Sequence, residues 1–238
     1  MLVLAANGHV VWIPLSRRRS SIRRSRGEYA VSAPRRRHIL TTAIEVFRRH
    51  GFRGSSLRQI AEEAGVSHGT LLYHFGSKDG LILEVLQLNE AGDRLSLQVV
   101  EDDAAAVLAV LINHFANQHQ YRTELYVSIM GEAIQNDHPG HTYMVRRYEF
   151  LIEFLEQCLC RLAADGRLHP GTDPASASRA IVALMDGLQV QWLYGGRETD
   201  IADDLQTMLK LIVTPQTWET SVEPRIDRLP VTVEQVLD

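Results

Sequence analysis

The most reactive side chains of the sequence are concentrated in one short stretch, AGVSHGTLLYHFGSK, at positions 64–78. It holds hydroxyl, imidazole and amine groups, which serve enzymes as nucleophiles and general bases. A catalytic triad requires a serine and a histidine side chain to meet through a hydrogen bond, but Ser67 and His68 are adjacent and diverge on a helix. We therefore interpret the stretch as a short helix that presents small polar groups to a binding partner.

Other signatures of enzymes are absent from the sequence. It contains no P-loop, no dinucleotide-binding glycine pattern, no HExxH motif and no glutamate followed three residues later by histidine. The histidines at positions 114, 119, 138 and 141 have no cysteine or carboxylate at metal-ligand spacing to support them. Glu149, Glu153 and Glu156 share a helix face that we interpret as solvated. The sequence therefore predicts neither an enzyme nor a metal or other cofactor.

The elements that position the polar stretch are short helices. One predicted helix runs from 34 to 50, because Pro34 suits a first helical turn and Gly51 suits the position after a helix. Ile39, Ala43 and Phe47 recur along one face of this helix, so we expect them to be buried.

Two further helices follow in quick succession. The first begins at Ser56, which has capping-box spacing with Gln59, and it ends at Gly65. Ser67 is placed to cap the next helix, and a fourth, longer helix begins after residue 77. Two short helices joined by a tight glycine-containing turn have the spacing of a helix-turn-helix unit.

The order of these motifs over about 50 residues is similar to the DNA-binding domain of the tetracycline-repressor (TetR) family. An Ile-Leu, Ala and Phe core is followed by IAEEAGVSHGT, then by Tyr-His-Phe and Ser-Lys. The resemblance implies an all-α fold, with an N-terminal three-helix helix-turn-helix DNA-binding domain and a helical-bundle ligand-binding and dimerisation domain. Leu72 departs from the family pattern, which usually has tyrosine there. The family's tyrosine–phosphate contact is then either lost or made by Tyr73.

The polar residues of the stretch suit a helix that enters the major groove of DNA. Bulky side chains at its N-terminal end would hold the backbone away from the bases, and SHGT keeps that end thin. Ser67 is equally explained as a helix cap alone, and His74 as a cap of the helix end, whereas Leu71, Leu72 and Phe75 are predicted to be core. The predicted DNA-binding residues are Arg53, Ser55, Ser56, Arg58, Ser67, His68, Gly69, Thr70, Tyr73, His74 and Lys78.

The charge distribution agrees with a polyanion-binding N-terminal part. Residues 1–90 carry 14 Lys and Arg against 7 Asp and Glu, whereas the rest of the chain carries 11 against 22. The segment SRRRSSIRRSRGEYAVSAPRRR alone holds nine arginines and one glutamate. We expect residues 1–31 to form a disordered basic arm, which either adds phosphate affinity or is merely solvated.

The bulk composition fits a cytoplasmic protein that does not enter a membrane. No apolar run approaches the roughly 18 residues that a membrane span needs. Cys158 and Cys160 are the only cysteines, and they are too close along the chain for a disulfide to be expected. We interpret them as two core thiols in a reducing compartment.

The remainder of the chain is also predicted to be helical, with helices at 103–118, 120–136, 141–165, 174–194 and 200–213. The resemblance implies that the last two pair with their copies in a second subunit. The helix 174–194 is apolar on several faces, which agrees with burial on several faces. An effector pocket would use aromatic, thioether and amide side chains, although an ordinary core would look the same. The candidates are Tyr126, Met130, Tyr143, Tyr148, Met185, Gln189 and Trp192.

The sequence thus divides into a basic arm (1–31), a helix-turn-helix DNA-binding domain (32–78), a helical effector-binding and dimerisation domain (79–214) and an irregular C-terminal tail (215–238). We expect a homodimeric transcriptional repressor that binds a near-palindromic operator in double-stranded DNA and is released by a small-molecule effector. Two rival interpretations are a constitutive or architectural DNA-binding protein without an effector, and a small helical enzyme. An effector pocket would argue against the first rival, and a cluster of histidines and carboxylates would favour the second.

Overall fold

The computed structural model describes residues 2–4, 10–12, 26–99, 103–117, 119–195 and 200–226, and their side chains over 34–88, 103–117, 119–195 and 200–226. The chain forms two compact units, Met1–Arg37 and His38–Asp238. In the first unit, strands β1 (Leu2–Leu4) and β2 (Val10–Trp12) pair antiparallel, with Val3 opposite Val11. These strands differ from the predicted disordered arm, because short β-branched and aromatic runs favour pairing. Most of the arm lies outside the described residues.

Helix α1 spans Arg26–His50 and therefore begins eight residues before the predicted start at Pro34. The preceding segment RGEYAVSA contains arginine, glutamate and alanines, which favour a helix. A proline inside a helix removes one backbone hydrogen bond, but its fixed φ angle is helical. The prediction was wrong because it treated Pro34 as a start signal only.

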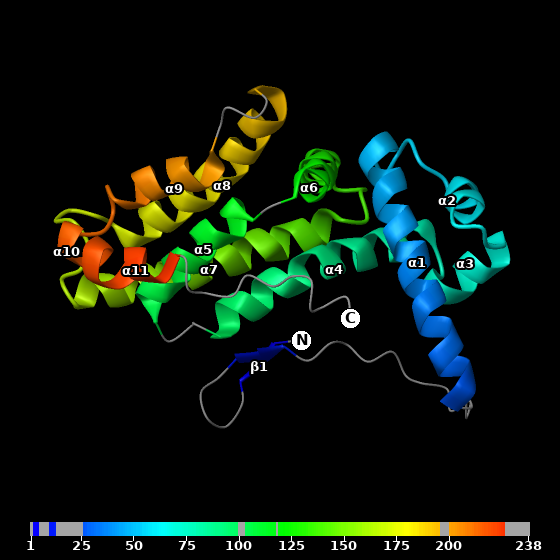
Figure 1. Cartoon of the computed structure of the whole chain (residues 1–238), viewed down its shortest axis with the longest axis horizontal. Coiled ribbons are helices and arrows are strands. Elements are labelled where there is room, and N and C mark those ends of the chain that lie inside the picture. The colour runs from blue at the N-terminus through cyan, green and yellow to red at the C-terminus, as the bar shows by residue number, and fades with distance from the viewer. Residues whose placement is uncertain are drawn as a thin grey trace. The chain divides into compact units, whose positions relative to one another are not determined.

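The helix-turn-helix unit has the predicted elements. Helix α2 spans Leu57–Glu63, α3 spans His68–Phe75 and α4 spans Lys78–Val99. Gly51 and Gly65, which end α1 and α2, adopt φ angles of +67° and +62°, a conformation that glycine tolerates at low cost. The core of the unit is a buried cluster that includes Ile39, Ala43 and Phe47 of α1, as predicted. The four helices are labelled in Figure 1.

Side-chain caps fix the starts of α2 and α3. Ser56 Oγ accepts a hydrogen bond from the backbone N–H of Gln59 at 3.1 Å, and Ser67 Oγ accepts one from Thr70 at 3.0 Å. The reciprocal half of the predicted capping box is not made, because the Gln59 side chain donates to Glu63 instead, at 3.2 Å. Each cap satisfies a backbone donor that would otherwise have no partner in the first helical turn.

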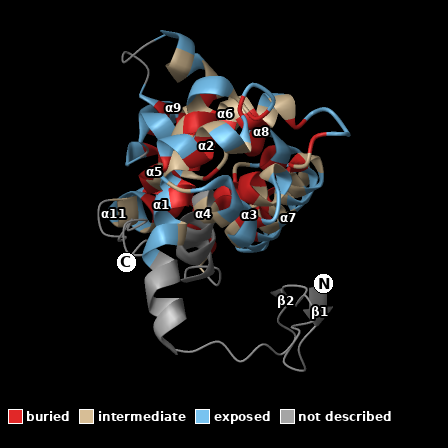
Figure 2. Ribbon diagram, turned by 90° about the vertical axis from the view of Figure 1, so that its right-hand side faces the viewer, coloured by how far each residue is buried: buried red, intermediate tan, exposed pale blue. Residues whose placement is uncertain are grey.

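A second, larger group of helices follows. It comprises α5 (Ala104–Ala116), α6 (Gln120–Glu132), α7 (His141–Ala164), α8 (Pro174–Gly195) and α9 (Ile201–Leu209). Helix α7 packs on α8 and α5, while α6 and α9 also pack on α8. The buried apolar residues of α8 and α9 and most of those of α5 and α7 form one core, whereas Leu125 and Ile129 of α6 belong to the buried cluster of the helix-turn-helix unit. Helix α5 is buried almost all around. Figure 2 marks the buried residues in red. The predicted helices agree with these bounds to within four residues.

The C-terminal tail is helical over residues 215–226, so the predicted irregular structure was wrong there. A short helix α10 (Pro215–Thr217) leads into a π-helical turn, η1 (Trp218–Val222), and then α11 (Glu223–Ile226). Thr214 caps α10 and Pro215 occupies its first turn, so this proline begins a helix instead of marking irregular structure. Trp218 and Val222 are buried in the apolar core, which holds the turn in place.

The two cysteines differ in environment. Cys158 is buried and Cys160 is exposed, and both are free thiols. The prediction of two core thiols was therefore wrong for Cys160, because residues two apart on a helix lie on nearly opposite sides.

Candidate nucleic-acid interface

Helix α3 is attached to its domain by one face and exposes the other. Leu71 is fully buried and Phe75 is 7% exposed, whereas Tyr73 is 63% exposed. Ser67, His68 and Gly69 at its N-terminal end are also exposed. The predicted core position of Leu72 was wrong, since this side chain is 37% exposed. Leu72 lies about 100° around the helix from the fully buried Leu71, at the edge of the buried face.

The N-terminal end of α3 is thin, as the sequence predicts. Ser67 Oγ lies 2.9 Å from Thr70 Oγ1, so the two hydroxyls share a hydrogen bond beside the backbone cap. A Cβ atom added at Gly69 would have Ser67 Oγ, at 3.7 Å, as its only neighbour within 4 Å. The domain therefore has room for a side chain at position 69, so packing within the domain does not require a glycine there.

Two predicted contact residues are used inside the domain instead. Ser55 is buried, and its hydroxyl donates to the Phe52 carbonyl oxygen at 2.8 Å. Lys78 Nζ donates to the Ser55 carbonyl oxygen at 2.6 Å and lies 4.4 Å from the centre of the Phe52 ring. Partial burial lowers the pKa of Lys78. We therefore remove Ser55 and Lys78 from the candidate DNA contacts, because the closed turn before α2 occupies both.

The other candidates around α2 are exposed, with one of them already paired. Ser56 and Arg58 are exposed at the start of α2. Arg53 is also exposed, and its guanidinium donates to Asp137 Oδ1 at 2.9 Å. His74 is half-buried, with its ring centre 5.3 Å from that of Tyr73. A phosphate contact by Arg53 would therefore compete with, or share the guanidinium with, the exposed Asp137 carboxylate.

Glu132, at the end of α6, holds the turn that connects α1 and α2. Its two carboxylate oxygens accept hydrogen bonds from the backbone N–H groups of Phe52 and Arg53, each at 2.9 Å. A Cβ atom at Gly51 would lie 2.2 Å from Glu132 Oε1, so a larger residue would displace this carboxylate, and the φ angle of +67° independently favours glycine. We call this contact the Glu132 clamp. Sequence reasoning missed it, and Gly51 was its only signal.

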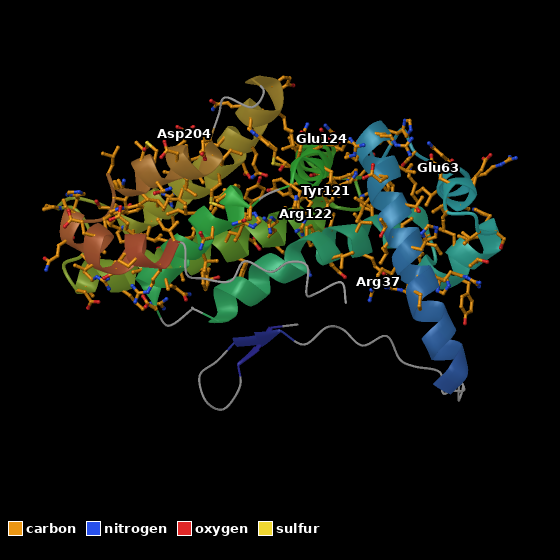
Figure 3. The ribbon with its side chains drawn as sticks, in the orientation of Figure 1. Arg37, Glu63, Tyr121, Arg122, Glu124 and Asp204 are labelled. Carbon is orange, nitrogen blue, oxygen red and sulfur yellow. The ribbon has the colours of Figure 1, made fainter. Side chains whose placement is uncertain are left out.

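Further contacts join the same elements. Arg48 donates to Glu124 of α6 at 2.6 Å, and Arg49 pairs with Glu63 of α2. Figure 3 labels Glu63 and Glu124, the carboxylates of α2 and α6 that pair with Arg49 and Arg48. Leu125 of α6 is buried in the same cluster as the core of the helix-turn-helix unit. Helix α6 therefore contacts the helix-turn-helix unit through ion pairs, hydrogen bonds to backbone N–H groups and apolar packing.

His138, one of the histidines considered for a metal site, is a core residue next to the clamp. Its ring makes an edge contact with Phe52 at 4.7 Å, and its Nδ1 accepts a hydrogen bond from the Gly140 N–H at 3.0 Å. Burial lowers the pKa of His138, with Glu132 opposing the shift in part. Over the described part of the chain, no group of three or more His, Cys, Asp or Glu residues has metal-binding geometry.

Three of the predicted effector residues lie together around a carboxylate that sequence reasoning missed. The hydroxyl of Tyr126 donates to Asp186 Oδ1 at 3.1 Å, and that of Tyr148 donates to Asp186 Oδ2 at 2.6 Å. The Tyr148 hydroxyl also lies 3.1 Å from Met130 Sδ. The Arg147 guanidinium lies 5.3 Å from the centre of the Tyr126 ring. We call these five residues, from α6, α7 and α8, the Asp186 cluster.

Burial dominates the electrostatics of the Asp186 cluster. It raises the pKa of Asp186, while the hydrogen bonds from Tyr148 and Tyr126 and the charge of Arg147 oppose the rise. Burial also raises the pKa of both tyrosines, so both stay protonated and donate to the carboxylate. The cluster thus combines a desolvated carboxylate, two hydroxyls, two aromatic rings and a guanidinium.

The remaining predicted effector residues have other partners. Tyr143 donates to the Leu86 carbonyl oxygen of α4 at 3.2 Å. Gln189 is buried and donates to the Met185 carbonyl oxygen of its own helix at 3.2 Å, while Met185 itself belongs to the large apolar core. Trp192 is half-buried and packs against that core. These four are therefore explained by packing, as an ordinary core would be.

Two family profiles match the chain. The profile of bacterial regulatory proteins of the tetR family matches residues 39–85, and that of the C-terminal domain of BetI-type transcriptional repressors matches 101–213. Together they cover about two thirds of the chain. The boundary between the two matched regions falls within or just after α4, which connects the helix-turn-helix unit to the larger group of helices.

Relatives and solved structures agree with the profiles. The regulator UidR of Escherichia coli K12 is 29% identical over 189 residues, covering 76% of this chain and 94% of UidR. NalD of Pseudomonas aeruginosa, the secondary repressor of the MexAB-OprM multidrug efflux pump, is 29% identical with a TM-score of 0.59, covering 78% and 98%. A transcriptional regulator from Saccharomonospora viridis in complex with choline, at 23% identity, shares the fold with a TM-score of 0.64, covering 76% and 99%. The predicted all-α architecture is thus confirmed, and the chain belongs to the TetR family of DNA-binding transcriptional regulators.

Proposed function

We propose that the protein is a cytoplasmic, homodimeric repressor that occupies a near-palindromic operator and is released from it by a small-molecule effector. The observation that supports DNA reading most directly is the exposed face of α3, with its thin N-terminal end held in place by buried Leu71 and Phe75. Among the described residues, no helix is long and apolar enough to cross a membrane. The relatives are regulators rather than enzymes.

The proposed DNA contacts divide by chemistry. Ser67, His68 and Thr70 at the start of α3 suit base edges, because Gly69 lets the backbone approach the major groove. Phosphate contacts, which fix register without reading sequence, suit side chains farther along α3 and at the start of α2. The proposed phosphate contacts are Arg53, Ser56, Arg58, Tyr73 and His74.

Apolar surface on the last helices supports the proposed homodimer. Tyr194 at the end of α8 is 90% exposed, and Met208 and Leu211, in α9 and just after it, are 42% and 66% exposed. Pairing these residues with their copies across a two-fold axis would remove them from water. The same axis would place two α3 helices on two operator half-sites, which is why the operator should be near-palindromic.

The Asp186 cluster is the proposed effector site. Related structures were solved with choline bound, in the S. viridis regulator, and with triclosan bound, in SmeT of Stenotrophomonas maltophilia. The desolvated carboxylate and two aromatic rings suit an effector that combines an apolar body with a positive charge or a hydrogen-bond donor.

Helix α6 offers a direct route from the effector site to the DNA-binding unit. Tyr126 and Met130 of the Asp186 cluster lie on α6, and the same helix ends in the Glu132 clamp. An effector that displaces the two cluster residues would therefore shift Glu132 and the turn before α2. Release of the operator requires an effector that binds the shifted conformation more tightly than the DNA-binding conformation. A coupling free energy of about 1–3 kcal/mol between effector binding and DNA binding is typical.

Operator selection from genomic DNA, followed by titration, tests this proposal. We expect one near-palindromic site that is bound at least 1000-fold more tightly than unrelated DNA at the same salt concentration, as is typical of specific binding. Thr70→Ala should weaken binding at least about fivefold without unfolding the protein, through the loss of a contact worth about 1 kcal/mol. Equal affinity for selected and unrelated DNA would contradict the proposed function.

A thermal-shift screen tests the effector site. Compounds that raise the melting temperature of the wild-type protein should raise it less in Tyr148→Phe, which retains the ring and loses the hydroxyl. Those compounds should also release the operator. A stabilising, releasing compound whose effect is the same in Tyr148→Phe would place the effector site elsewhere.

A further inference from the structure

Leu72 is an apolar side chain on the exposed face of the reading helix. Its neighbour Leu71 is fully buried and Phe75 is 7% exposed, whereas Leu72 is 37% exposed. The buried cluster of the helix-turn-helix unit contains Leu71 and Phe75 but not Leu72. More than a third of Leu72 therefore stays accessible to a partner beyond its own domain.

The position of Leu72 on α3 places it beside the thin end of the helix. It follows His68 by four residues and Gly69 by three, so the three positions lie on one face. His68 and Gly69 are exposed, and a Cβ atom at Gly69 would meet nothing closer than 3.7 Å. A DNA duplex that approaches Gly69 closely would therefore also meet Leu72.

A leucine side chain cannot read DNA through hydrogen bonds. It has no donor for a phosphate or for a purine N7, and no acceptor for an exocyclic amine. The base edges of the major groove offer one apolar group that distinguishes a base pair, the C5-methyl group of thymine. Apolar side chains in the groove recognise that methyl by excluding water from it.

From this chemistry and position, and resting on the proposed function, we infer that Leu72 reads the C5-methyl group of a thymine in each operator half-site. Leu72 is then a specificity-determining residue. Burying one methyl-sized group corresponds to a preference of about fourfold in each half-site. The preference over both half-sites of a symmetric dimer is then on the order of tenfold or more.

Replacement of thymine by deoxyuridine tests the inference, because it removes the C5-methyl group and leaves the hydrogen-bonding edge unchanged. Each thymine of the selected operator is replaced in turn, symmetrically in both half-sites, and affinity is measured at fixed salt. Wild-type protein should lose about tenfold or more at one symmetric pair of thymines. Leu72→Ala should bind the thymine and deoxyuridine operators equally at that pair, and Leu72→Met should retain the wild-type preference.

Tyr73→Ala is the matched control, since Tyr73 is exposed on the same helix and is assigned to phosphate. It should weaken binding to both operators by the same factor and leave the methyl preference intact. The inference is overturned if no methyl removal weakens wild-type binding, if the preference persists in Leu72→Ala, or if the half-site contains no thymine. These outcomes leave operator binding itself in place, whereas a wild-type protein that does not distinguish operator from unrelated DNA would overturn the proposed function as well.

Discussion

Gly69→Ala should make the protein more stable and a weaker DNA binder at the same time. Gly69 is the second residue of α3, and its φ angle is outside the left-handed region that favours glycine. An added Cβ atom would have a single neighbour, Ser67 Oγ, at an ordinary contact distance of 3.7 Å. The domain can therefore accept alanine without strain.

The two effects have different origins and opposite signs. Alanine restricts the unfolded chain and favours the helix, which should raise the free energy of unfolding by about 0.5 kcal/mol. On DNA, the added methyl group keeps the N-terminal end of α3 away from the base edges. Loss of one base contact worth about 1 kcal/mol in each of two half-sites gives about 2 kcal/mol, or roughly 30-fold in affinity.

Urea unfolding and an operator titration at fixed salt measure the two effects on the same preparation. Gly131→Ala is the matched control, because Gly131 is also an exposed helical glycine with open space around its Cβ position. This control should gain stability and keep wild-type operator affinity. The reasoning is refuted if Gly69→Ala is destabilised, or if it binds the operator as tightly as the wild type.

The other predictions concern the clamp, the effector site, the buried histidine and the basic arm. Glu132→Gln should lower the free energy of unfolding by about 1–2 kcal/mol in urea titrations, because an amide presents one acceptor to two backbone donors; an unchanged midpoint would show that the clamp contributes nothing. Asp186→Asn should reduce the binding of a cationic effector in calorimetry more than that of a neutral analogue, and an equal loss of both would exclude a counter-ion role. Burial lowers the pKa of His138, so over part of the pH range the unfolded state binds a proton that the native state does not. The free energy of unfolding should therefore decrease as pH falls from the ordinary histidine pKa of about 6.5 towards the lower native value. The free energy of unfolding of His138→Gln should decrease less over the same pH range. Deletion of residues 1–25, which precede α1, should reduce the slope of log affinity against log salt concentration, and an identical slope would mean that this segment does not contact phosphate.

The helix-turn-helix unit could be predicted from the sequence because its signals are local. Ser56 and Ser67 cap the helices that follow them, and Gly51 and Gly65 end the helices that precede them. Each signal acts over three or four residues, and the apolar spacing of α1 indicates which face is buried. The same local logic failed at Pro34 and Pro215, because a proline can continue or begin a helix as well as break one.

The parts of the site that could not be predicted depend on contacts between distant segments. Glu132 meets Phe52 and Arg53 across about 80 residues of sequence, and nothing near Glu132 distinguishes it from a solvated glutamate. Asp186 follows Met185 on a largely apolar helix, and its two tyrosine partners lie 38 and 60 residues away. Periodicity indicated that α8 is buried, but which polar group its neighbours enclose is decided only by how α6, α7 and α8 pack.

The most direct test of DNA reading by a symmetric dimer is a titration of the selected operator with one half-site scrambled. If two α3 helices read two half-sites, scrambling either half should weaken binding at least 100-fold at fixed salt, because the base contacts of one subunit are lost. Thr70→Ala should then weaken binding to the intact operator more than to the half-scrambled one. Unchanged affinity after scrambling either half-site would contradict the account.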